Sequence, residues 1–369
     1  MVDMEIEQGT VLQVDWSRPG LQCLKVQVGN RLEKALNYPE IAGVAHPGDR
    51  IAVNTTAVKL GLGSGGFHYV YFNYSQGSKK LNPGGHIIKL RYTPFQIKVL
   101  TFEEIWVQEK PSQALDVFTG LQGTPVLIGE LHSMLPPAIL TLKKINPNRR
   151  IVYIMDDSAA LPIRLSDNIS RLQEEGFLSA TITCGHAFGG DYETVNIYTA
   201  LMAAKEKCQA DIILIAPGPG VVGTGTRYGC SGILQGEHVN RVARWNGTPI
   251  VMPRISFSEK RLRHNGFSHH LLTALEEIST FKAFVPVPQL SKKKLKTLFL
   301  QLKATGIHKK HKIILTPAKR FIRKELKNAG FQFETMQRGF DADPDFFISI
   351  IAASIFTENI LVKRDLPGK

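Results

Sequence analysis

From Thr124 onward, short apolar runs rich in β-forming residues alternate with stretches long enough to be helices. Two of these stretches, 166–175 and 192–208, are amphipathic. Strands that alternate with helices pair in parallel, and a parallel sheet needs cover on both faces. The sequence therefore predicts an α/β fold with a doubly wound, mostly parallel sheet, whose expected strands are 125–128, 150–155, 180–184, 211–216, 249–252, 283–286, 312–315 and 331–333.

Capping residues predict where two of the helices begin or end. Asp191 and Thr194, which follow a Gly-Gly pair, indicate the N-cap region of the helix that ends near Cys208. Gly176 is expected at the C′ position of the preceding helix, because glycine adopts the left-handed conformation found there.

The first ninety residues follow a different pattern. The segments 9–16, 21–28 and 49–54 alternate as half-buried strands do, and turn sequences separate them. Short strands at this spacing predict a small β-barrel. A chain of 369 residues exceeds the usual size of one hydrophobic core. We therefore expect a β-rich domain over 1–94, a linker over 95–123 and a Rossmann-like α/β domain over 124–369.

Composition indicates an ordinary globular protein. Hydrophobic residues make up 43% of the chain and charged residues 21%. The first residues are acidic, which argues against a signal peptide, and the longest apolar run, 346–356, is too short to span a bilayer. The four cysteines show no paired spacing and are expected to be reduced thiols. We expect a cytoplasmic protein without membrane contact.

A glycine-rich stretch follows the expected strand 211–216. It contains six glycines between Ala216 and Gly232. Glycine removes the Cβ atoms that keep a ligand off the backbone, and it leaves N–H groups able to point at an anion. We predict a loop that accepts a phosphate, a carboxylate or an acyl oxygen; the alternative is a turn that merely packs closely. The expected ligand-binding residues are Gly218, Gly220, Gly223, Thr224, Gly225, Thr226, Arg227 and Arg254.

The loop matches the Gly-x-Gly-x-x-Gly dinucleotide fingerprint, but its context argues against a nicotinamide dinucleotide site. Pro219 occupies a variable position, and further glycines from Gly225 onward disfavour an immediate helix. The next strand ends in Arg254 rather than in an acid that would hold a ribose hydroxyl. The Gly-Lys-Ser/Thr of a Walker A motif is absent, and the sequence names no cofactor.

Polar residues follow five of the expected strands at their carboxyl ends. Ligands bind at this edge of open parallel sheets. We therefore expect the five strand ends to converge on one site. They deliver Glu130 with His132, Asp156 with Asp157, His186 with Asp191, the glycine-rich loop, and Arg254 with Ser256.

His132, His186 and Asp191 are the candidates for acid–base catalysis, with His186 and Asp191 as the preferred pair. Histidines at the same edge are also candidate metal ligands, although no spacing such as His-x-x-x-His supports a metal site. Successive helical residues point about 100° apart, so at most one of His269 and His270 is expected to face a common site. The acids considered with these histidines are Glu130, Asp156, Asp157, Asp191 and Glu237.

Two cysteines, Cys184 and Cys230, also lie near the expected edge. A neighbouring helix N-terminus would lower a thiol pKa and permit nucleophilic catalysis. Nothing in the sequence places a base beside either cysteine, so a buried, inert thiol is the favoured interpretation.

The net charge of +13 comes almost entirely from residues 291–330, which contain thirteen Lys or Arg and one acid. The apolar residues of this segment recur at helical spacing and leave a cationic face. A solvated helix surface is the slightly favoured interpretation, and contact with RNA, DNA or an acidic partner is the alternative.

Four motifs resemble those of an uncharacterised family of bacterial proteins, mainly Gram-positive, known only as a domain of unknown function. They are 129–137 (GELHSMLPP), 185–191 (GHAFGGD), 220–226 (GVVGTGT) and 266–270 (GFSHH). The resemblance runs over nearly the whole chain and includes 91–94 (RYTP). It implies a cytoplasmic bacterial protein and assigns no activity, so no catalytic residue is taken from it.

Two hypotheses follow. The first is an α/β enzyme, of unspecified class, that binds a phosphorylated or nucleotide-like small molecule at the strand ends and converts it by His/Asp acid–base chemistry. The second is a non-catalytic regulatory or nucleic-acid-binding protein that uses the β domain and the basic helices of 291–330.

Overall fold

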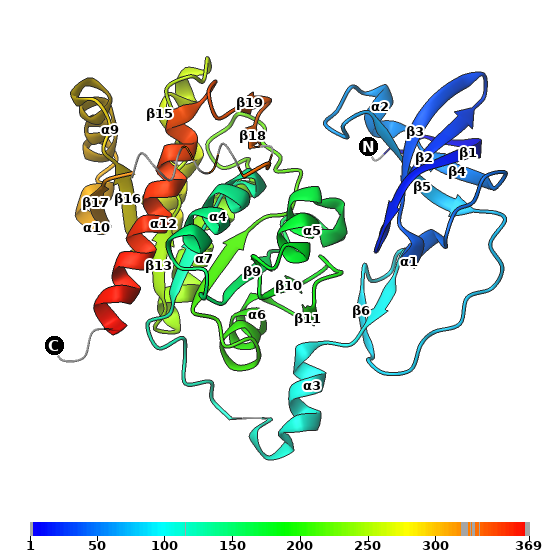
Figure 1. Ribbon diagram of the computed structural model, residues 1–369, viewed down its shortest axis with the longest axis horizontal. Helices are drawn as coiled ribbons and strands as arrows, with labels where there is room; N and C mark the ends of the chain where they lie inside the picture. Colours follow the sequence, from blue (N-terminus) through cyan, green and yellow to red (C-terminus); the bar gives the residue numbers. More distant parts are fainter. Residues whose placement is uncertain are drawn as a thin grey trace. The chain divides into compact units, whose positions relative to one another are not determined.

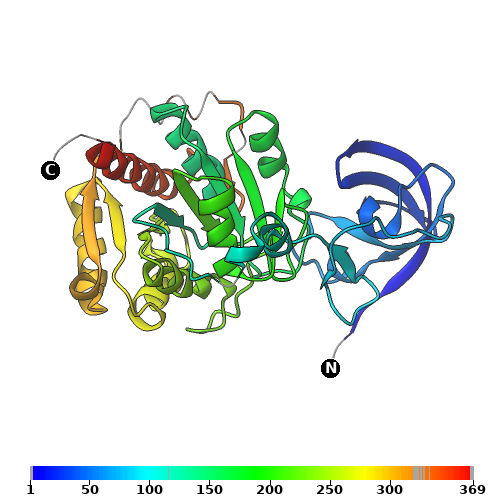
Figure 2. The same ribbon diagram turned by 90° about the horizontal axis from the view of Figure 1, so that it is seen from below.

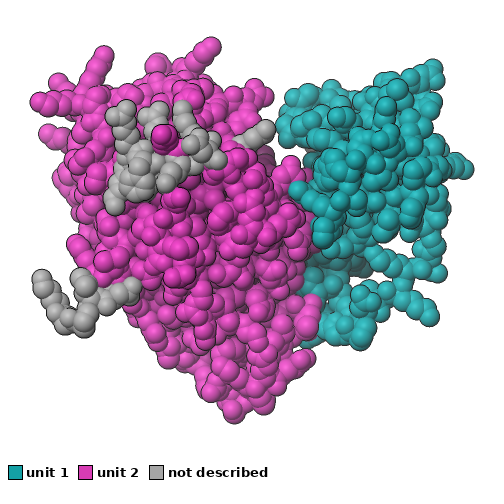
Figure 3. Space-filling view, viewed as in Figure 1, with its two compact units in different colours: residues 1–99 teal, residues 100–369 magenta. Residues whose placement is uncertain are grey.

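The computed structural model describes residues 3–114, 116–318, 324, 326, 329–331 and 333–365. The chain divides into two compact units, Met1–Val99 and Leu100–Lys369 (Figure 3). The stretch 95–123, expected from the sequence as a linker, contains this boundary. It also contains strand β7 (Ile97–Val99), which pairs with β6 (Ile87–Lys89), and helix α3 (Phe102–Glu109), which starts at a capping box formed by Thr101 and Glu104.

The first unit contains a closed barrel, as the sequence predicts (Figure 1). Its strand order is β1-β2-β3-β5-β4; β3 and β5 are parallel, and the other neighbours are antiparallel. This order and these directions are those of a five-stranded OB-type barrel. The strands are β1 (Ile6–Arg18), β2 (Leu21–Val28), β3 (Arg31–Asn37), β4 (Arg50–Asn54) and β5 (Phe67–Asn73); the short helices α1 (Pro39–Ala42) and α2 (Thr56–Lys59) lie between them in the chain.

The second unit is built on an eight-stranded sheet in which all neighbouring strands are parallel, which confirms the predicted α/β fold. From one edge to the other the strands are β11 (Tyr192–Thr194), β10 (Ala180–Cys184), β9 (Ile151–Met155), β12 (Ile212–Ala216), β8 (Pro125–Ile128), β13 (Thr248–Val251), β16 (Phe284–Pro288) and β17 (Lys312–Thr316). Because β12 lies between β8 and β9, the order differs from that of the dinucleotide-binding fold, in which the fingerprint follows the first strand.

Helices cover both faces of this sheet (Figure 2). One hydrophobic core joins the sheet to α4 (Leu135–Ile145), α5 (Asp167–Glu174) and α12 (Pro344–Asp365). The other joins it to α6 (Ile197–Met202), α7 (Leu234–Arg244), α8 (His269–Thr273) and α9 (Lys292–Ala304). Successive strand residues alternate between the two cores: Leu127 lies in the first, while Val126 and Ile128 lie in the second.

Helix α12 fills the centre of the first core. By length and composition Pro344–Arg364 could cross a membrane, but 72% of its most apolar window is buried inside the protein. Its Ser349 hydroxyl donates to the carbonyl of Pro253, which follows β13. The apolar run 346–356 is thus the middle of a longer core helix.

Two local predictions are corrected by the structure. Strand β11 occupies part of the stretch expected to be helical, and the helix begins at Ile197, where the Asn196 side chain accepts hydrogen bonds from two backbone N–H groups. Asp191 and Thr194 precede this cap, so neither is the N-cap.

Gly176 follows α5 with a φ of +71°, as predicted. The expected strand 331–333 includes a residue outside the described part of the chain, and the short strands β18 (Glu334–Thr335) and β19 (Arg338–Gly339) follow it.

Helix α7 approaches the backbone of a neighbouring helical turn, the π-helix Ala274–Ile278, through a glycine. A Cβ on Gly236 would lie 2.4 Å from the carbonyl oxygen of Ala274. We expect Gly236→Ala to lower the free energy of unfolding by about 1–3 kcal/mol in urea titrations, because the turn cannot move away without losing its own packing. Gly339→Ala is the matched control, since its Cβ would meet only one atom, at 3.6 Å. Equal stability of the two variants would contradict this explanation.

Candidate functional site

The five strands that carry polar residues at their carboxyl ends are neighbours in the sheet, in the order β10-β9-β12-β8-β13. Because they are parallel, their carboxyl ends lie along one edge, called here the carboxyl edge. The loops that follow β8, β12 and β13 bring several charged and imidazole groups together there, whereas part of the loop after β10 leaves the edge.

The glycine-rich stretch folds as a tight hairpin over 222–231. The Thr224 N–H donates to the Gly229 carbonyl at 2.8 Å, and the Ser231 N–H donates to the Val222 carbonyl at 3.0 Å. Thr226 accepts a bond from the Gly229 N–H through its hydroxyl. A short 3-10 turn, Ser231–Ile233, separates this hairpin from α7. The loop therefore does not lead directly into a helix. The extra glycines from Gly225 onward predicted this absence of an immediate helix.

At three of the glycines expected to bind a ligand, the structure shows why the residue is glycine. Gly220 and Gly225 have φ values of +96° and +81°, which side chains other than glycine rarely adopt. A Cβ on Gly218 would lie 3.0 Å from the sulfur of Met155. Gly223 forms an isolated bridge with Cys230 at the base of the hairpin.

The two expected ligand-binding arginines are engaged with carboxylates. The Arg227 guanidinium contacts Glu276, at 2.9 Å, and Glu277, so it anchors the exposed hairpin to the segment after α8. Arg254 is buried and lies 2.9 Å from Glu130, which is also buried. Burial raises the pKa of Glu130, and the charge of Arg254 opposes that shift.

His132 links two segments of the edge. Its Nδ1–H donates to the Pro217 carbonyl at 3.1 Å, and its Nε2 lies 2.6 Å from the Ser166 hydroxyl. Burial lowers the pKa of His132 to about 4, although the bond to Pro217 acts in the opposite direction. Both ring nitrogens are engaged, so this histidine holds the loop after β12 against the start of α5.

His186 and Asp191 are separated along β10. His186 follows the carboxyl end of the strand, and its backbone N–H donates to Asp157 at 2.8 Å. The Asp191 carboxylate instead accepts bonds from the backbone N–H and hydroxyl of Thr181, at the other end of β10, and from Gln173. Thr181 and Gly185 are roughly 13 Å apart at the rise of a strand. Asp191 therefore lies away from the carboxyl edge, because the chain turns back to begin β11.

A buried acid–histidine pair was not recognised from the sequence. Asp156 at the end of β9 lies 2.9 Å from Nε2 of His238, which is on α7. Burial raises the pKa of Asp156, but hydrogen bonds from His238 and Ser158 outweigh it and lower the pKa overall. An Arg241 nitrogen lies 3.3 Å from the other ring nitrogen of His238. Only the packing of α7 onto the sheet places this histidine opposite the acid.

Three histidines gather after β13. The potential ligand atoms of His264, His269 and His270 all lie within 4.8 Å of one another. The prediction that at most one of His269 and His270 faces a common site is wrong. Both lie in the first turn of α8, their ring centroids are 3.9 Å apart, and His264 approaches from the preceding loop. The length of the side chains lets the two rings converge despite the angle between their Cα–Cβ bonds.

Buried polar contacts hold the loop that carries these histidines. The Ser256 hydroxyl donates to the Asp343 carboxylate at 2.8 Å, just before α12 begins. Arg338 bridges Asp343, at 3.2 Å, and Glu259, at 3.0 Å. The pKa of Glu259 is well below its usual range, chiefly because Arg261 donates to it. These contacts fix the first part of the loop after β13 against the segment that precedes α12.

Cys184 and Cys230 are both buried. Burial raises the pKa of the Cys230 thiol, and the carboxylate of Glu130 adds to this shift. A raised pKa disfavours the thiolate, which agrees with the interpretation of Cys230 as an inert thiol.

The described part of the basic segment forms α9 and α10 (Ile307–Lys310) before β17. Lys294 pairs with Asp345 at 2.6 Å, and Lys310 donates to two carbonyl groups near the end of α8. These two lysines stabilise the fold, while Lys292, Lys293 and Lys309 are exposed. Most of the later part of the basic segment, 319–328, lies outside the described residues.

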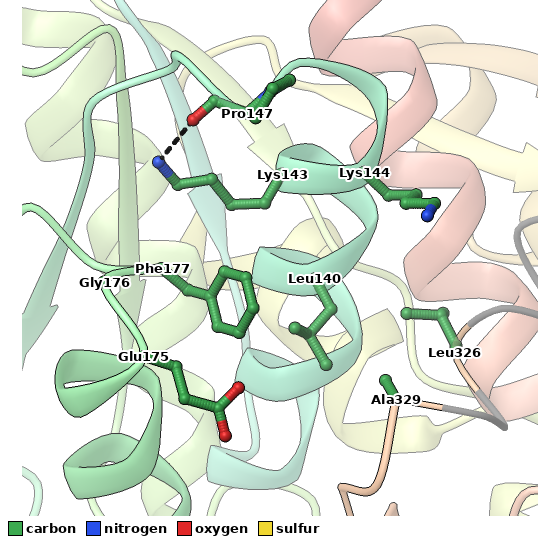
Figure 4. A pocket seen from close by; sticks show the side chains of 9 residues that line it. All are labelled: Leu140, Lys143, Lys144, Pro147, Glu175, Gly176, Phe177, Leu326 and Ala329. Atoms are coloured by element: carbon green, nitrogen blue, oxygen red, sulfur yellow. Dashed lines mark hydrogen bonds between the residues drawn. The ribbon is translucent and has the colours of Figure 1, made fainter.

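A cavity of about 560 Å³ lies at the other end of the sheet (Figure 4). Lys143 and Lys144 line it from the end of α4, and Glu175 and Phe177 line it from the end of α5. Lys143 donates to the Pro147 carbonyl at 3.0 Å. Because crossover helices run opposite to the strands, their carboxyl ends lie at the amino edge. This cavity is therefore remote from the polar strand ends.

The family model described as "Protein of unknown function (DUF3866)" matches residues 34–354, from within β3 to within α12. The chain belongs to this family. The match includes β4, β5 and part of β3 of the barrel, the whole parallel sheet and the three histidines. No curated protein and no solved structure matches the chain. The family description names no activity, so the chemistry must come from the site itself.

The lowered pKa of His132 predicts a pH-dependent stability. Unfolding restores a pKa near 6.5, so below that pH the unfolded chain binds a proton that the folded chain excludes until about pH 4. Stability should therefore fall as the pH decreases from 7 to 5, and His132 should contribute roughly 1 kcal/mol of that fall because its ring retains some solvent contact. Urea titrations of His132→Gln should show a smaller loss. An equal loss in both proteins would contradict the prediction.

Proposed function

We propose that this protein binds an anionic small molecule, phosphorylated or nucleotide-like, at the carboxyl edge and exchanges protons with it. The binding site we propose lies between the glycine-rich hairpin and the loop after β13. A phosphorylated metabolite as ligand agrees with the cytoplasmic location expected from the sequence.

The observation that carries this proposal is the position of Arg263. Its guanidinium lies over Gly225, where an added Cβ would be 3.6 Å from a guanidinium nitrogen. Arg263 is exposed, and no carboxylate pairs with it among the described residues. An uncompensated guanidinium against a glycine backbone suits a phosphate or carboxylate, which it can bind through two parallel hydrogen bonds.

The surrounding charges support the same ligand class. After burial, the largest effect on the pKa of His264 is the charge of Arg254, followed by that of Arg261. Arg263 and Arg254 act in the same direction on His269. These arginines therefore create a positive potential around the imidazoles, although Arg254 and Arg261 are paired with Glu130 and Glu259. An anion placed there would lower the electrostatic energy of the cluster.

Proton exchange with the ligand would fall to imidazoles at the same edge. Burial is the main cause that lowers the pKa of His264 to about 3 and that of His270 to about 4, so both are neutral but weakly basic at pH 7, which leaves proton transfer to another imidazole. Of the residues expected from the sequence to act in proton transfer, His186 remains at this edge. His132 has both nitrogens engaged, and Asp191 lies at the other end of β10.

A ligand panel tests the proposal. Phosphate, pyrophosphate, nucleotides and sugar phosphates are titrated against the full chain, with thermal shift to detect binding and calorimetry to measure it. We expect at least one phosphorylated compound to stabilise the protein, and Arg263→Ala to weaken its binding at least 10-fold, as expected for a lost charge-assisted hydrogen bond. Arg244→Ala, which removes an exposed arginine at the end of α7, should leave the affinity unchanged. An affinity that is the same in Arg263→Ala as in the unmodified chain, or no binding of any anion, would overturn the proposal.

The barrel supports a second candidate function, the binding of single-stranded nucleic acid. OB-type barrels bind oligonucleotides across the face of their second and third strands. On this barrel, Lys25 and Lys34 are exposed and opposite one another in β2 and β3. Trp16 of β1 pairs in register with Cys23, two residues from Lys25, and is 41% exposed. An exposed ring beside lysines is the combination used to stack bases and contact phosphates.

Fluorescence anisotropy with labelled single-stranded DNA and RNA tests this second function. We expect binding at low salt that weakens steeply as salt is raised, and at least 10-fold weaker binding by Trp16→Ala because one base loses its stacking partner. Tyr92→Ala removes a ring that is 99% exposed elsewhere in the same unit and serves as the control. Undetectable binding at low salt, or equal binding by Trp16→Ala, would exclude this function for the barrel.

A further inference from the structure

The cluster formed by His264, His269 and His270, called here the three-histidine cluster, has the composition of a metal centre. His264 ends a short 3-10 turn, and the other two begin α8. The strand pair β14 (Ile255–Ser256) and β15 (Gly266–Phe267) closes the loop between them, which brings His264 back to the start of α8. The pairing of β14 with β15 therefore holds His264 close to the start of α8.

Each imidazole of the cluster offers a nitrogen that could bind an ion. Nδ1 of His264 lies 3.0 Å from the hydroxyl of Ser268, the residue that caps α8. Nε2 of His269 and Nδ1 of His270 are buried, and neither has a hydrogen-bond partner among the described residues. A buried nitrogen without a hydrogen-bond partner destabilises the folded protein. These two atoms belong to neighbouring imidazoles whose ring centroids are 3.9 Å apart, and one shared cation would satisfy both.

The orientation of His264 follows the pattern of a metal ligand. Metal-bound histidines usually engage their second nitrogen in a hydrogen bond, which sets the tautomer and the ring direction. Ser268 occupies Nδ1 of His264, which leaves Nε2 for an ion. A tetrahedral ion with bonds of about 2.0–2.1 Å holds its nitrogens roughly 3.4 Å apart. The ligand atoms lie within 4.8 Å, so small side-chain rotations close the site.

We propose that His264, His269 and His270 bind one divalent transition-metal ion of the zinc class through three imidazole nitrogens. Imidazole suits Zn²⁺, Co²⁺, Ni²⁺ or Fe²⁺, whereas Mg²⁺ and Ca²⁺ prefer oxygen ligands. Three protein ligands leave at least one coordination position for water or an anion, as in catalytic rather than structural zinc sites.

Positively charged side chains surround the cluster, because the charges of Arg254, Arg261 and Arg263 all act on its imidazoles. The nearby arginines repel a bare cation, but they attract an anion that shares the ion's open position. The inference does not depend on the proposed anion ligand, because metal uptake is measured with the ion alone.

The test uses the full chain, purified without a polyhistidine tag and stripped with a chelator. Zn²⁺ and Mg²⁺ are titrated by calorimetry, and Co²⁺ is added to record the visible d–d spectrum. We expect one Zn²⁺ per chain with a dissociation constant in the micromolar range or tighter, no heat with Mg²⁺, and a Co²⁺ spectrum of four- or five-coordinate type. Failure to bind Zn²⁺ and Co²⁺, or a stoichiometry well below one, would overturn the proposal.

Variants locate the ion. His269→Ala and His270→Ala should each weaken Zn²⁺ binding at least 100-fold and abolish the Co²⁺ spectrum, while His308→Ala, which removes an exposed histidine on α10, should bind as the unmodified chain does. Circular dichroism verifies folding, and His269→Gln serves as a milder substitution if the alanine variant does not fold. Arg263→Ala should retain the ion while losing the phosphorylated ligand, so the two proposals fail separately. Unchanged Zn²⁺ affinity in folded His269 and His270 variants would place the ion elsewhere and contradict the assignment.

Discussion

Eight strands that all run in one direction cannot be joined by hairpins, so each connection must cross a face of the sheet. The crossovers supply the helices that bury both faces, and α12 completes the cover of one face from the end of the chain. They also place every turn that follows a strand on the carboxyl edge. The candidate site depends on this arrangement, because its loops follow three adjacent strands, β12, β8 and β13.

Buried polar contacts then give the carboxyl edge its shape. Arg254 and Glu130 form a buried ion pair, and Asp343 ties the loop after β13 to the start of α12. Gln235 of α7 donates to the carbonyl of Ile128 at the end of β8. Each of these groups would be costly to bury alone, so the loops have few alternative arrangements. A rigid frame of this kind can hold unpaired imidazole nitrogens close together.

Much of the fold could be predicted from the sequence, because apolar periodicity reports directly on burial. Seven of the expected strands correspond to β8, β9, β10, β12, β13, β16 and β17, and an N-terminal barrel was also expected. The short edge strand β11 could not be predicted. It has only three residues and, apart from one bridge between Glu193 and Thr101, pairs only with β10, so it lacks the continuous apolar run of a central strand. Its presence moves Asp191 off the carboxyl edge.

The candidate site was predictable only in part. That the glycine-rich stretch and Arg254 would lie at strand ends followed from parallel pairing. Which partner each charged group would meet did not: Arg227 pairs with Glu276 and Glu277, about fifty residues later in the chain. His264 was not selected, because an isolated histidine in a loop carries no periodic signal.

The sequence by itself determined the class of fold and the edge of the sheet where polar groups collect, because strand and helix periodicity follow from local burial. Only the tertiary structure decided which of those groups meet. The return of the loop after β13 brings His264 to α8, and the packing of α7 brings His238 to Asp156. Such contacts depend on how segments far apart in the chain are oriented in three dimensions, and no residue spacing encodes that orientation.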